Sequence, residues 1–401
     1  MSTKSPQSYK KILGLDIGSS KVTACLCDVG SEGDVHTRGL ASFPSIGIVK
    51  GKIEYPDELK RAIRKAIQRA ELTAGSCAEH VIATLPFYSI ESSMRTGSIQ
   101  LPDPYLPITE KDKMDCLRQS KSQDLSVNET ILHIIPIVYR VDGVSTHNPI
   151  GLTGKHLEAD THILTIKTAI IDTLSTIFND LSLHISGLLY EPLAAAHVYL
   201  DEHQREKGAY IIDCGGRFTK VSFFQNHLLQ KTVILPIGGD TITGDIAYCL
   251  KIPMVDAERL KTLYGDLRFS HMNPQEKIRV SPSDTAEVNR RMFCQIIEAR
   301  VAEMIGLLQK KMSFHMDLRH DCVLVGGSHK LGGFQAYLEE TLGHPVRSGF
   351  TPTLESFGHP TDHASALGCI LYGVRNRVIP FPKSPHPDIL ARFNQWVHDF
   401  F

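Results

Sequence analysis

The sequence lacks several features that would place it in a specialised class of protein. No run of the roughly 20 apolar residues that a membrane-spanning helix needs occurs in the 401 residues. Residues 1–11 are polar and lack the apolar segment of a signal peptide. The net charge is −1, so no basic excess indicates a nucleic-acid partner. An ordinary soluble globular protein that does not bind nucleic acid is therefore expected.

Cysteine and histidine are present but show no metal-ligand spacing. The nine cysteines contain no Cys-x-x-Cys pair, and the nineteen histidines contain no His-Glu-x-x-His. Cys25 and Cys27 alternate along one predicted strand, which favours core packing over metal binding. Scattered thiols in odd number fit a reducing cytosol, and no structural metal is predicted.

What the sequence does contain is one unit used twice. Residues 12–26 read ILGLDIGSSKVTACL, and residues 210–224 read YIIDCGGRFTKVSFF. Each is an apolar strand, an aspartate, a glycine-containing turn and a second strand, which predicts a hairpin. Glycine lets backbone N–H groups approach a phosphate, and aspartate can hold Mg²⁺ through water. Two such tips in one chain predict two similar domains that bind a nucleotide.

A third glycine-rich turn supports this interpretation. Residues 321–334 read DCVLVGGSHKLGGF, a buried strand running into a helix start with Ser328 as a candidate N-cap. Alone, it is equally a plain strand-to-helix turn. With the two hairpins it gives, in chain order, two phosphate-binding loops followed by an adenosine-binding loop. That order is typical of the actin, Hsp70 and hexokinase fold, in which two related α/β domains with mixed five-stranded sheets close on ATP.

Two segments rich in small residues predict closely packed helices. Residues 188–200 carry Pro192 at a helix start, and residues 364–373 look like a counterpart near the end of the chain. They fit a pair of hinge helices, although a generic buried helix explains each pattern as well.

Residues 81–165 bring the sequence close to a known family. They contain ILHIIPIVYRVDG at 131–143 and NPIGLTGKHLE at 148–158. These runs resemble the inserted 1C subdomain of the FtsA family of bacterial cell-division proteins. The resemblance continues through LPIGGDTITGDIA at 235–247 and DAERLKTLYG at 256–265, and it covers about the whole chain.

The resemblance implies an actin-like α/β fold of two duplicated RNase H-like domains. The implied bounds are 1–84 and 163–188 for domain 1A, 85–162 for the inserted SHS2-like subdomain 1C, 189–238 and 320–379 for domain 2A, 239–319 for subdomain 2B, 380–387 for a proline-rich linker and 388–401 for a C-terminal amphipathic membrane-targeting helix.

The residues of the tail themselves support the predicted linker and membrane-targeting helix. Four prolines in residues 380–387 favour an extended, semi-rigid linker. Beyond them, one apolar stripe recurs at three- and four-residue steps: Ile389, Phe393, Trp396, Val397 and Phe400. A helix docked on the second domain would explain the stripe. The linker and the only tryptophan favour a helix lying in the membrane plane, where few positive charges leave apolar insertion to dominate.

By position, the resemblance implies a site for ATP and Mg²⁺. The implied cofactor-binding residues are Asp16, Gly18, Ser19, Ser20 and Lys21 around the first phosphate loop, Asp213, Gly215 and Gly216 in the second, Gly326, Gly327 and Ser328 beside adenosine, and Gly239, Glu258 and Lys261 toward adenine and ribose. Asp16 and Asp213 would hold hydrated Mg²⁺. From the residues alone, Glu258 and Lys261 are better explained as an i, i+3 ion pair on a solvated helix.

The second phosphate loop departs from the family pattern Asp-x-Gly-Gly-Gly-Thr-Thr-Asp. Arg217, Phe218 and Lys220 replace the third glycine, the first threonine and the last aspartate. Arg217 is expected either to lose a φ > 0 conformation and crowd the phosphate, or, with Lys220, to strengthen phosphate binding at the expense of turnover. No residue stands out as a general base, so no catalytic residue and at most weak ATPase activity are predicted.

The implied function is a cell-division protein that binds ATP, self-associates as actin does and anchors the FtsZ ring to the cytoplasmic face of the inner membrane at the septum. Subdomain 1C would recruit later division proteins. The FtsZ tail would dock on 2B, where Arg290, Arg291 and Arg300 could meet its carboxylates, although a solvated basic face is the simpler explanation of each arginine. Two alternatives stay open: an adaptor of a pilus-type envelope machine, and a kinase or ATPase on the same fold.

Overall fold

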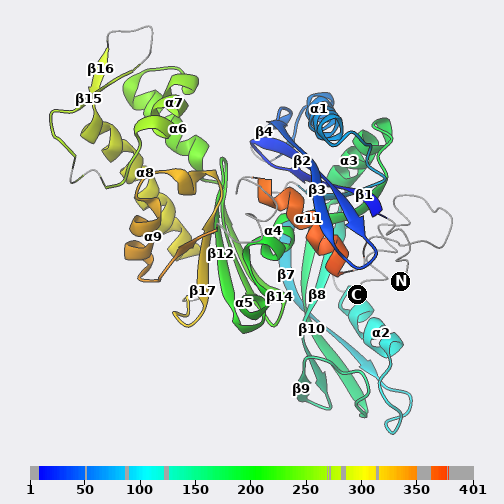
Figure 1. Cartoon of the computed structure of the whole chain (residues 1–401). Coiled ribbons are helices and arrows are strands. Elements are labelled where there is room, and N and C mark those ends of the chain that lie inside the picture. Colours follow the sequence, from blue (N-terminus) through cyan, green and yellow to red (C-terminus); the bar gives the residue numbers. More distant parts are fainter. Residues whose placement is uncertain are drawn as a thin grey trace, which may run out of the picture. The chain divides into compact units, whose positions relative to one another are not determined.

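A computed structural model describes residues 9–49, 52–85, 90–121, 126–268, 270, 272–280, 286–312, 316–349, 363–376 and 378 (Figure 1). The chain divides into two compact units. Unit 1 holds residues 1–198, 228–230 and 363–401, and unit 2 holds residues 199–227 and 231–362. The predicted linker and membrane helix at 380–401 lie outside the described residues. The predicted domain bounds remain a prediction.

Unit 1 is built on a mixed five-stranded sheet in the order β11-β6-β1-β2-β3. The strands are β1 (Tyr9–Ile17), β2 (Lys21–Gly30), β3 (Val35–Pro44), β6 (His80–Leu85) and β11 (Ile185–Tyr190), and a short hairpin, β4 (Ile48–Val49) with β5 (Lys52–Ile53), follows β3. β1 runs antiparallel to β2 and parallel to β6. Residues 12–15 of β1 and 22–30 of β2 are buried, as expected for central strands that helices cover on both faces.

The register shows which helix covers which face. Gly14 pairs with Cys25, and a Cβ atom on Gly14 would meet helix α11 (Ala364–Arg375). Gly39 pairs with Leu26, one position along, and its Cβ atom would meet α1 (Pro56–Ala74). Since successive residues point to opposite faces, α11 and α1 lie on opposite sides of the sheet. Cys25 and Cys27 are both fully buried, as predicted.

An inserted subdomain of unit 1 has a four-stranded antiparallel sheet in the order β7-β10-β8-β9. Its elements are β7 (Ile90–Gln100), α2 (Glu110–Lys121), β8 (Glu129–Val141), β9 (Val144–Thr146) and β10 (His156–Lys167). α2 packs on the sheet over a core of its own that includes Cys116, Leu117 and Ile134. β10 runs past the predicted boundary at residue 162 and leads directly into α3 (Thr168–Asp180), which precedes β11.

Unit 2 repeats the sheet of unit 1, in the order β14-β13-β12-β17-β18. The strands are β12 (Ala209–Cys214), β13 (Thr219–Gln225), β14 (Leu228–Leu235), β17 (Asp321–Val325) and β18 (Arg347–Ser348). β12 is antiparallel to β13 and parallel to β17, just as β1 is to β2 and β6. The predicted duplication of an α/β unit is therefore confirmed.

Helices α6 (Gly239–Leu250), α7 (Met254–Tyr264), α8 (Arg290–Lys311) and α9 (Phe334–Leu342) share one core with this sheet. A two-stranded ribbon of β15 (Lys277–Arg279) and β16 (Glu287–Asn289) adds to the same core. Unit 2 also contains α5 (Glu202–Lys207) and the short 3-10 helix η3 (Gly327–Lys330). Over the residues that the structure describes in both units, no helix is long and apolar enough to cross a membrane.

Candidate nucleotide site

The first predicted phosphate loop is the tip of the β1–β2 hairpin in unit 1. Gly18 N donates to the carbonyl oxygen of Lys21 over 3.0 Å, which closes a turn that contains Ser19 and Ser20. A Cβ atom on Gly18 would lie 2.8 Å from that same oxygen, so a larger residue would open the turn. The loop is therefore a tight glycine turn, as the sequence predicts.

Asp16, two residues before this turn, is held in place by the neighbouring strand. Thr84 of β6 pairs in register with Asp16, and its Oγ1 donates to Asp16 Oδ1 over 2.6 Å. Ile17 N donates to the same hydroxyl over 3.3 Å. Sequence reasoning missed Thr84, because its only signal is the pairing of β1 with β6.

The second predicted phosphate loop, in unit 2, has the same construction. Gly215 N donates to the carbonyl oxygen of Phe218 over 2.9 Å, and Cys214 pairs with Thr219 at the base of the turn. Asp213 lies two residues before Gly215, as Asp16 does before Gly18. The hairpins with an acid before a glycine turn are therefore confirmed as structure.

Gly326, after β17, lies against the second loop. Its φ is +89°, and a Cβ atom on it would lie 2.3 Å from Asp213 Oδ1. Ser328 lies inside η3, whose N-cap is Gly326, and its Oγ is 3.4 Å from the Gly215 carbonyl oxygen. The prediction of Ser328 as a helix N-cap is wrong, because the chain makes a 3-10 turn, which also contains Gly327, before α9 begins.

Gly239, Glu258 and Lys261 also come together at this loop. Gly239 N donates to the Gly215 carbonyl oxygen over 2.9 Å. Lys261 Nζ donates to the Gly239 carbonyl oxygen over 3.0 Å and lies 2.7 Å from Glu258 Oε2. The i, i+3 ion pair therefore exists, and Lys261 also ties α7 to the start of α6 at Gly239, which itself bonds to the glycine turn. Thr243 Oγ1, 2.8 Å from Lys261 Nζ, joins this network; its spacing of four from Gly239 was the available signal.

The three residues that depart from the family pattern have separate surroundings. Arg217 Nε lies 3.4 Å from Asp240 Oδ2 in the first turn of α6, and Arg217 is not among the described residues with positive φ. Position 217 therefore needs no φ > 0 conformation, and the expected loss of one on replacing glycine by Arg217 does not arise. Phe218 is 3% exposed. Lys220 Nζ lies 2.6 Å from Asp213 Oδ2.

The three arginines predicted to meet a partner's carboxylates lie on α8, as expected. Arg300 donates to both carboxylate oxygens of Asp245 on α6, with Nη2 2.9 Å from Oδ1. Arg290 Nη1 lies 2.8 Å from Glu276 Oε1. Arg291 is half-buried on the first turn of α8. Two of these guanidinium groups are thus engaged inside unit 2.

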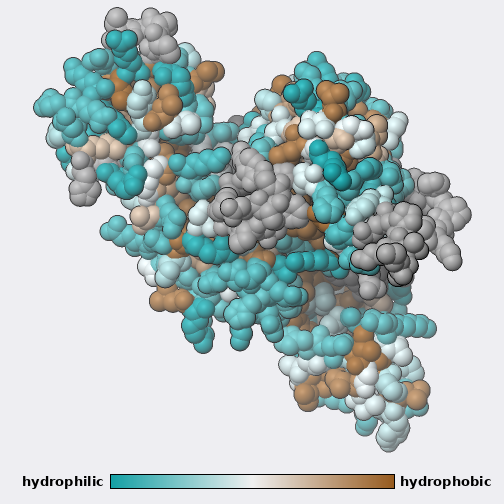
Figure 2. Space-filling model, in the orientation of Figure 1, coloured by the Kyte–Doolittle hydropathy of each residue, from teal (hydrophilic) through white to brown (hydrophobic). Residues whose placement is uncertain are grey.

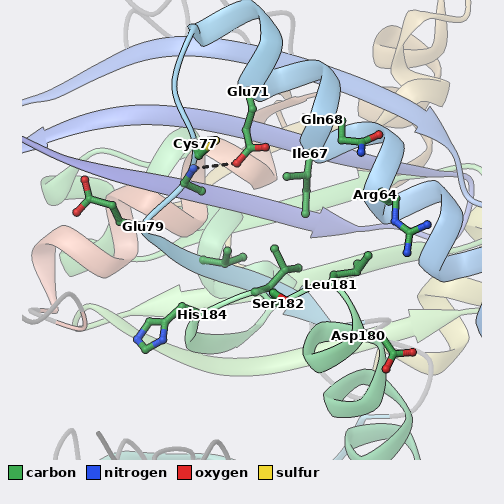
Figure 3. A pocket seen from close by; sticks show the side chains of 13 residues that line it. Arg64, Ile67, Gln68, Glu71, Cys77, Glu79, Asp180, Leu181, Ser182 and His184 are labelled. Carbon is green, nitrogen blue, oxygen red and sulfur yellow. Dashed lines mark hydrogen bonds between the residues drawn. The ribbon is translucent and has the colours of Figure 1, made fainter. Parts of the chain in front are cut away.

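A cavity of about 450 Å³ lies elsewhere, in unit 1 (Figure 3). Residues of α1, among them Arg64 and Glu71, form one side, and the turn after α3, with Ser182 and His184, forms another. No residue predicted to bind nucleotide lines it. The cavity adjoins the amino end of β6 at Val81, whereas Asp16 and Thr84 mark the carboxyl ends of β1 and β6, where α/β sheets bind ligands.

Comparisons with known proteins agree with this architecture. The family model "Cell division protein FtsA" matches residues 210–368, and the model "SHS2 domain inserted in FTSA" matches residues 88–165. The FtsA of Pseudomonas aeruginosa is 27% identical, over 99% of this chain and 100% of the relative. The FtsA of Escherichia coli is 27% identical, over 91% of this chain and 90% of the relative.

Two solved structures show the same fold. The PilM–PilN type IV pilus biogenesis complex gives a TM-score of 0.67 at 17% identity, covering 92% of this chain and 99% of that chain. MreB5 of Spiroplasma citri bound to AMPPNP gives 0.51 at 12% identity, covering 91% and 95%. With the duplicated sheet and hairpin, these similarities define an actin-like fold. The two family models and the full-length relatives narrow the class further: the chain belongs to the FtsA family.

Proposed function

We propose that this chain is a cell-division adaptor that binds ATP, self-associates in an actin-like manner and anchors the FtsZ ring to the cytoplasmic face of the inner membrane at the septum. The observation that carries the proposal is the SHS2-type subdomain inserted in a duplicated actin-like fold. The relatives that match along the whole chain are cell-division proteins by name. Recruitment of later division proteins is proposed for the inserted subdomain.

ATP is the proposed nucleotide, because both glycine turns are closed by the same backbone bond and an MreB of the same fold binds AMPPNP. Gly18–Lys21, Gly215 and Gly216 are the proposed phosphate contacts. Gly239, Glu258, Lys261 and residues 326–328 are proposed to face the nucleoside. Among the residues described in the two units, no cluster of three or more acidic, His or Cys side chains could hold a metal alone. Mg²⁺ is therefore proposed to arrive with the phosphates, with Asp16 as its carboxylate contact through water.

FtsZ binding is proposed for the α6–α8 region of unit 2. Apolar side chains are exposed on α6 and α7, including Tyr248 (86%), Val255 (81%) and Leu263 (61%). Figure 2 shows apolar surface over this region. A peptide with apolar and acidic residues would match such a surface bordered by Arg290, Arg291 and Arg300. Lipid binding is proposed for the tail at 388–401.

The experiment that tests the proposal is a pull-down from a bacterial lysate with the full chain as bait. Recovery of FtsZ, with loss of recovery after charge and apolar substitutions on α6–α8, is expected. Recovery of pilus-assembly components without FtsZ would overturn the cell-division function in favour of the pilus-type alternative. Titration calorimetry with AMPPNP tests the nucleotide separately and should show one site. Phosphorylation of a small substrate at the cost of ATP would instead indicate a kinase.

A further inference from the structure

Lys220 places a fixed cation on the aspartate of the second phosphate loop. Asp213 and Lys220 are direct cross-strand partners on β12 and β13, so their side chains leave the same face of the hairpin. Lys220 Nζ lies 2.6 Å from Asp213 Oδ2, and the side chains of Lys220 and Asp213 are 5% and 19% exposed. A lysine buried to this extent is retained as a charge only when it is paired. The ammonium group is therefore part of the loop.

The first hairpin has a threonine at the equivalent cross-strand position. Asp16 pairs across the strands with Thr23 rather than with a lysine, and its Oδ1 accepts a hydrogen bond from the neutral hydroxyl of Thr84. The cross-strand partner of the aspartate therefore differs between the two hairpins. The difference arises from one position, Thr23 in the first copy and Lys220 in the second.

Asp213 does not fit the role of a second anchor for hydrated Mg²⁺. One carboxylate oxygen is in contact with the Lys220 ammonium. The other is so close to the Gly326 backbone that a single Cβ atom there would lie 2.3 Å from it. Hydrated Mg²⁺ needs near-octahedral oxygen geometry around it, and at this carboxylate it would have to displace a cation that is already bound.

The local charge balance points in the same direction. Asp213 with Lys220 and Asp240 with Arg217 form two ion pairs at the loop, each with zero net charge. A carboxylate without a partner cation would repel a triphosphate bound beside it, and a divalent ion normally removes that repulsion. Here the lysine already removes it.

We propose that Lys220 takes over the charge-neutralising part that Mg²⁺ plays at the second loop, so that the chain binds ATP with little dependence on the metal. This inference rests on the proposed nucleotide-binding function. Lys220 then determines that the site accepts metal-free nucleotide as well as metal-bound nucleotide. Lys220 holds the Asp213 carboxylate; it transfers no proton and forms no bond to the nucleotide in this role.

The test is calorimetric titration of the full chain with AMPPNP in Mg²⁺ and in EDTA. We expect the wild-type Kd to change by less than about threefold on metal removal. Lys220→Asp, which gives the residue usual in the family, should make binding at least about tenfold weaker in EDTA than in Mg²⁺, because two neighbouring carboxylates then face the phosphates. Lys220→Met should lie between these limits.

A matched control is Lys60→Met in α1, because Lys60, like Lys220, is ion-paired (with Asp57 and Asp180), but lies far along the chain from the loop. It should behave as the wild type. A wild-type Kd that weakens tenfold or more in EDTA overturns the inference, even if every Lys220 variant fails to fold. Absence of binding under both conditions overturns the nucleotide-binding function itself.

Discussion

A Cβ atom on Gly368 of α11 would lie 2.2 Å from the carbonyl oxygen of Ala194 in α4 (Glu191–Tyr199). The backbones of these two helices are therefore in contact, as their small residues predict. Ser365 Oγ donates to Glu191 Oε1 over 2.7 Å at the same crossing. On its other side, α11 contacts β1, since a Cβ atom on Gly14 would lie 1.8 Å from the Ala366 carbonyl oxygen. Two glycines, Gly368 on α11 itself and Gly14 on β1, therefore allow α11 to pack closely against α4 and β1.

Gly368→Ala should destabilise unit 1. Alanine normally gains about 1 kcal/mol over glycine inside a helix, but here the methyl group would push the two helices apart, at a net cost of about 1–3 kcal/mol. Urea unfolding measures the change. Gly306→Ala on α8, where the added Cβ atom meets nothing within 4 Å, should instead stabilise unit 2. Two stabilising alanines would contradict the close crossing of α4 and α11.

Gly326→Val should abolish AMPPNP binding. The residue has a φ of +89°, and a Cβ atom would collide with Asp213 Oδ1 at 2.3 Å, so both the backbone and the carboxylate must move. Gly143→Val is the control, because Gly143 has a φ of +83° with open space around it. It should cost stability only and retain the wild-type Kd. Equal Kd values for the two variants would remove Gly326 from the nucleotide site.

Arg300 is expected to exchange its internal partner for the FtsZ tail. Arg300→Glu should weaken binding of an FtsZ tail peptide by about tenfold or more, whereas Arg64→Glu in unit 1 should not. Asp245→Asn removes the internal competitor of Arg300 and should strengthen binding a few-fold. Fluorescence anisotropy with a labelled peptide gives both values. If Asp245→Asn weakens binding, Arg300 serves only to join α6 to α8.

Asp160→Asn should destabilise the inserted subdomain at neutral pH but not in acid. The hydrogen bonds from Arg140, with Nη1 2.7 Å from Asp160 Oδ2, hold the pKa of Asp160 below its ordinary value, and Thr96 contributes in the same direction against the effect of burial. Because the folded-state pKa is lowered, the stabilisation is present above the unfolded carboxyl pKa and is lost as the pH falls through the folded value.

We expect a loss of about 1–2 kcal/mol at pH 7 for Asp160→Asn, since the pair is partly exposed. Thermal unfolding of both proteins from pH 7 downward measures the difference, which should shrink steadily in acid. A difference that is independent of pH would mean that asparagine acts through packing, and that the ion pair with Arg140 contributes little.

The tail should carry membrane binding. In vesicle co-sedimentation, the full chain is expected in the pellet, while a truncation after Pro387 and Trp396→Glu stay in solution and still bind AMPPNP. Several partly buried apolar side chains contribute less than the 1.5–3 kcal/mol of a fully buried one, but clustering on a filament multiplies their effect. With few basic residues, sedimentation should change only modestly with salt. Sedimentation of the truncated chain would mean that the tail is a docked helix.

The sequence by itself determined the features that depend on local conformation. The glycine turns after Asp16 and Asp213 and the apolar strands before them were predicted from backbone sterics and residue spacing. The close packing of α4 and α11 was predicted from their small residues. These patterns predict a duplicated α/β fold, and the structure has it. The runs at 131–143 and 148–158 indicated the inserted subdomain through their resemblance to the FtsA family, and not through local conformation.

Only the tertiary structure decided which side chains meet across the strands. The sequence offered Lys220 as a positive charge that, with Arg217, would strengthen phosphate binding, and the β12–β13 register places its ammonium group on Asp213. In the same way Thr84 reaches Asp16 through the pairing of β6 with β1, and Arg300 reaches Asp245 through the packing of α8 on α6. Thr84 is 68 residues from Asp16, and Arg300 is 55 residues from Asp245. Within the β12–β13 hairpin, a register shift of one residue would turn Lys220 to the other face of the sheet. Local spacing carries no information about that choice.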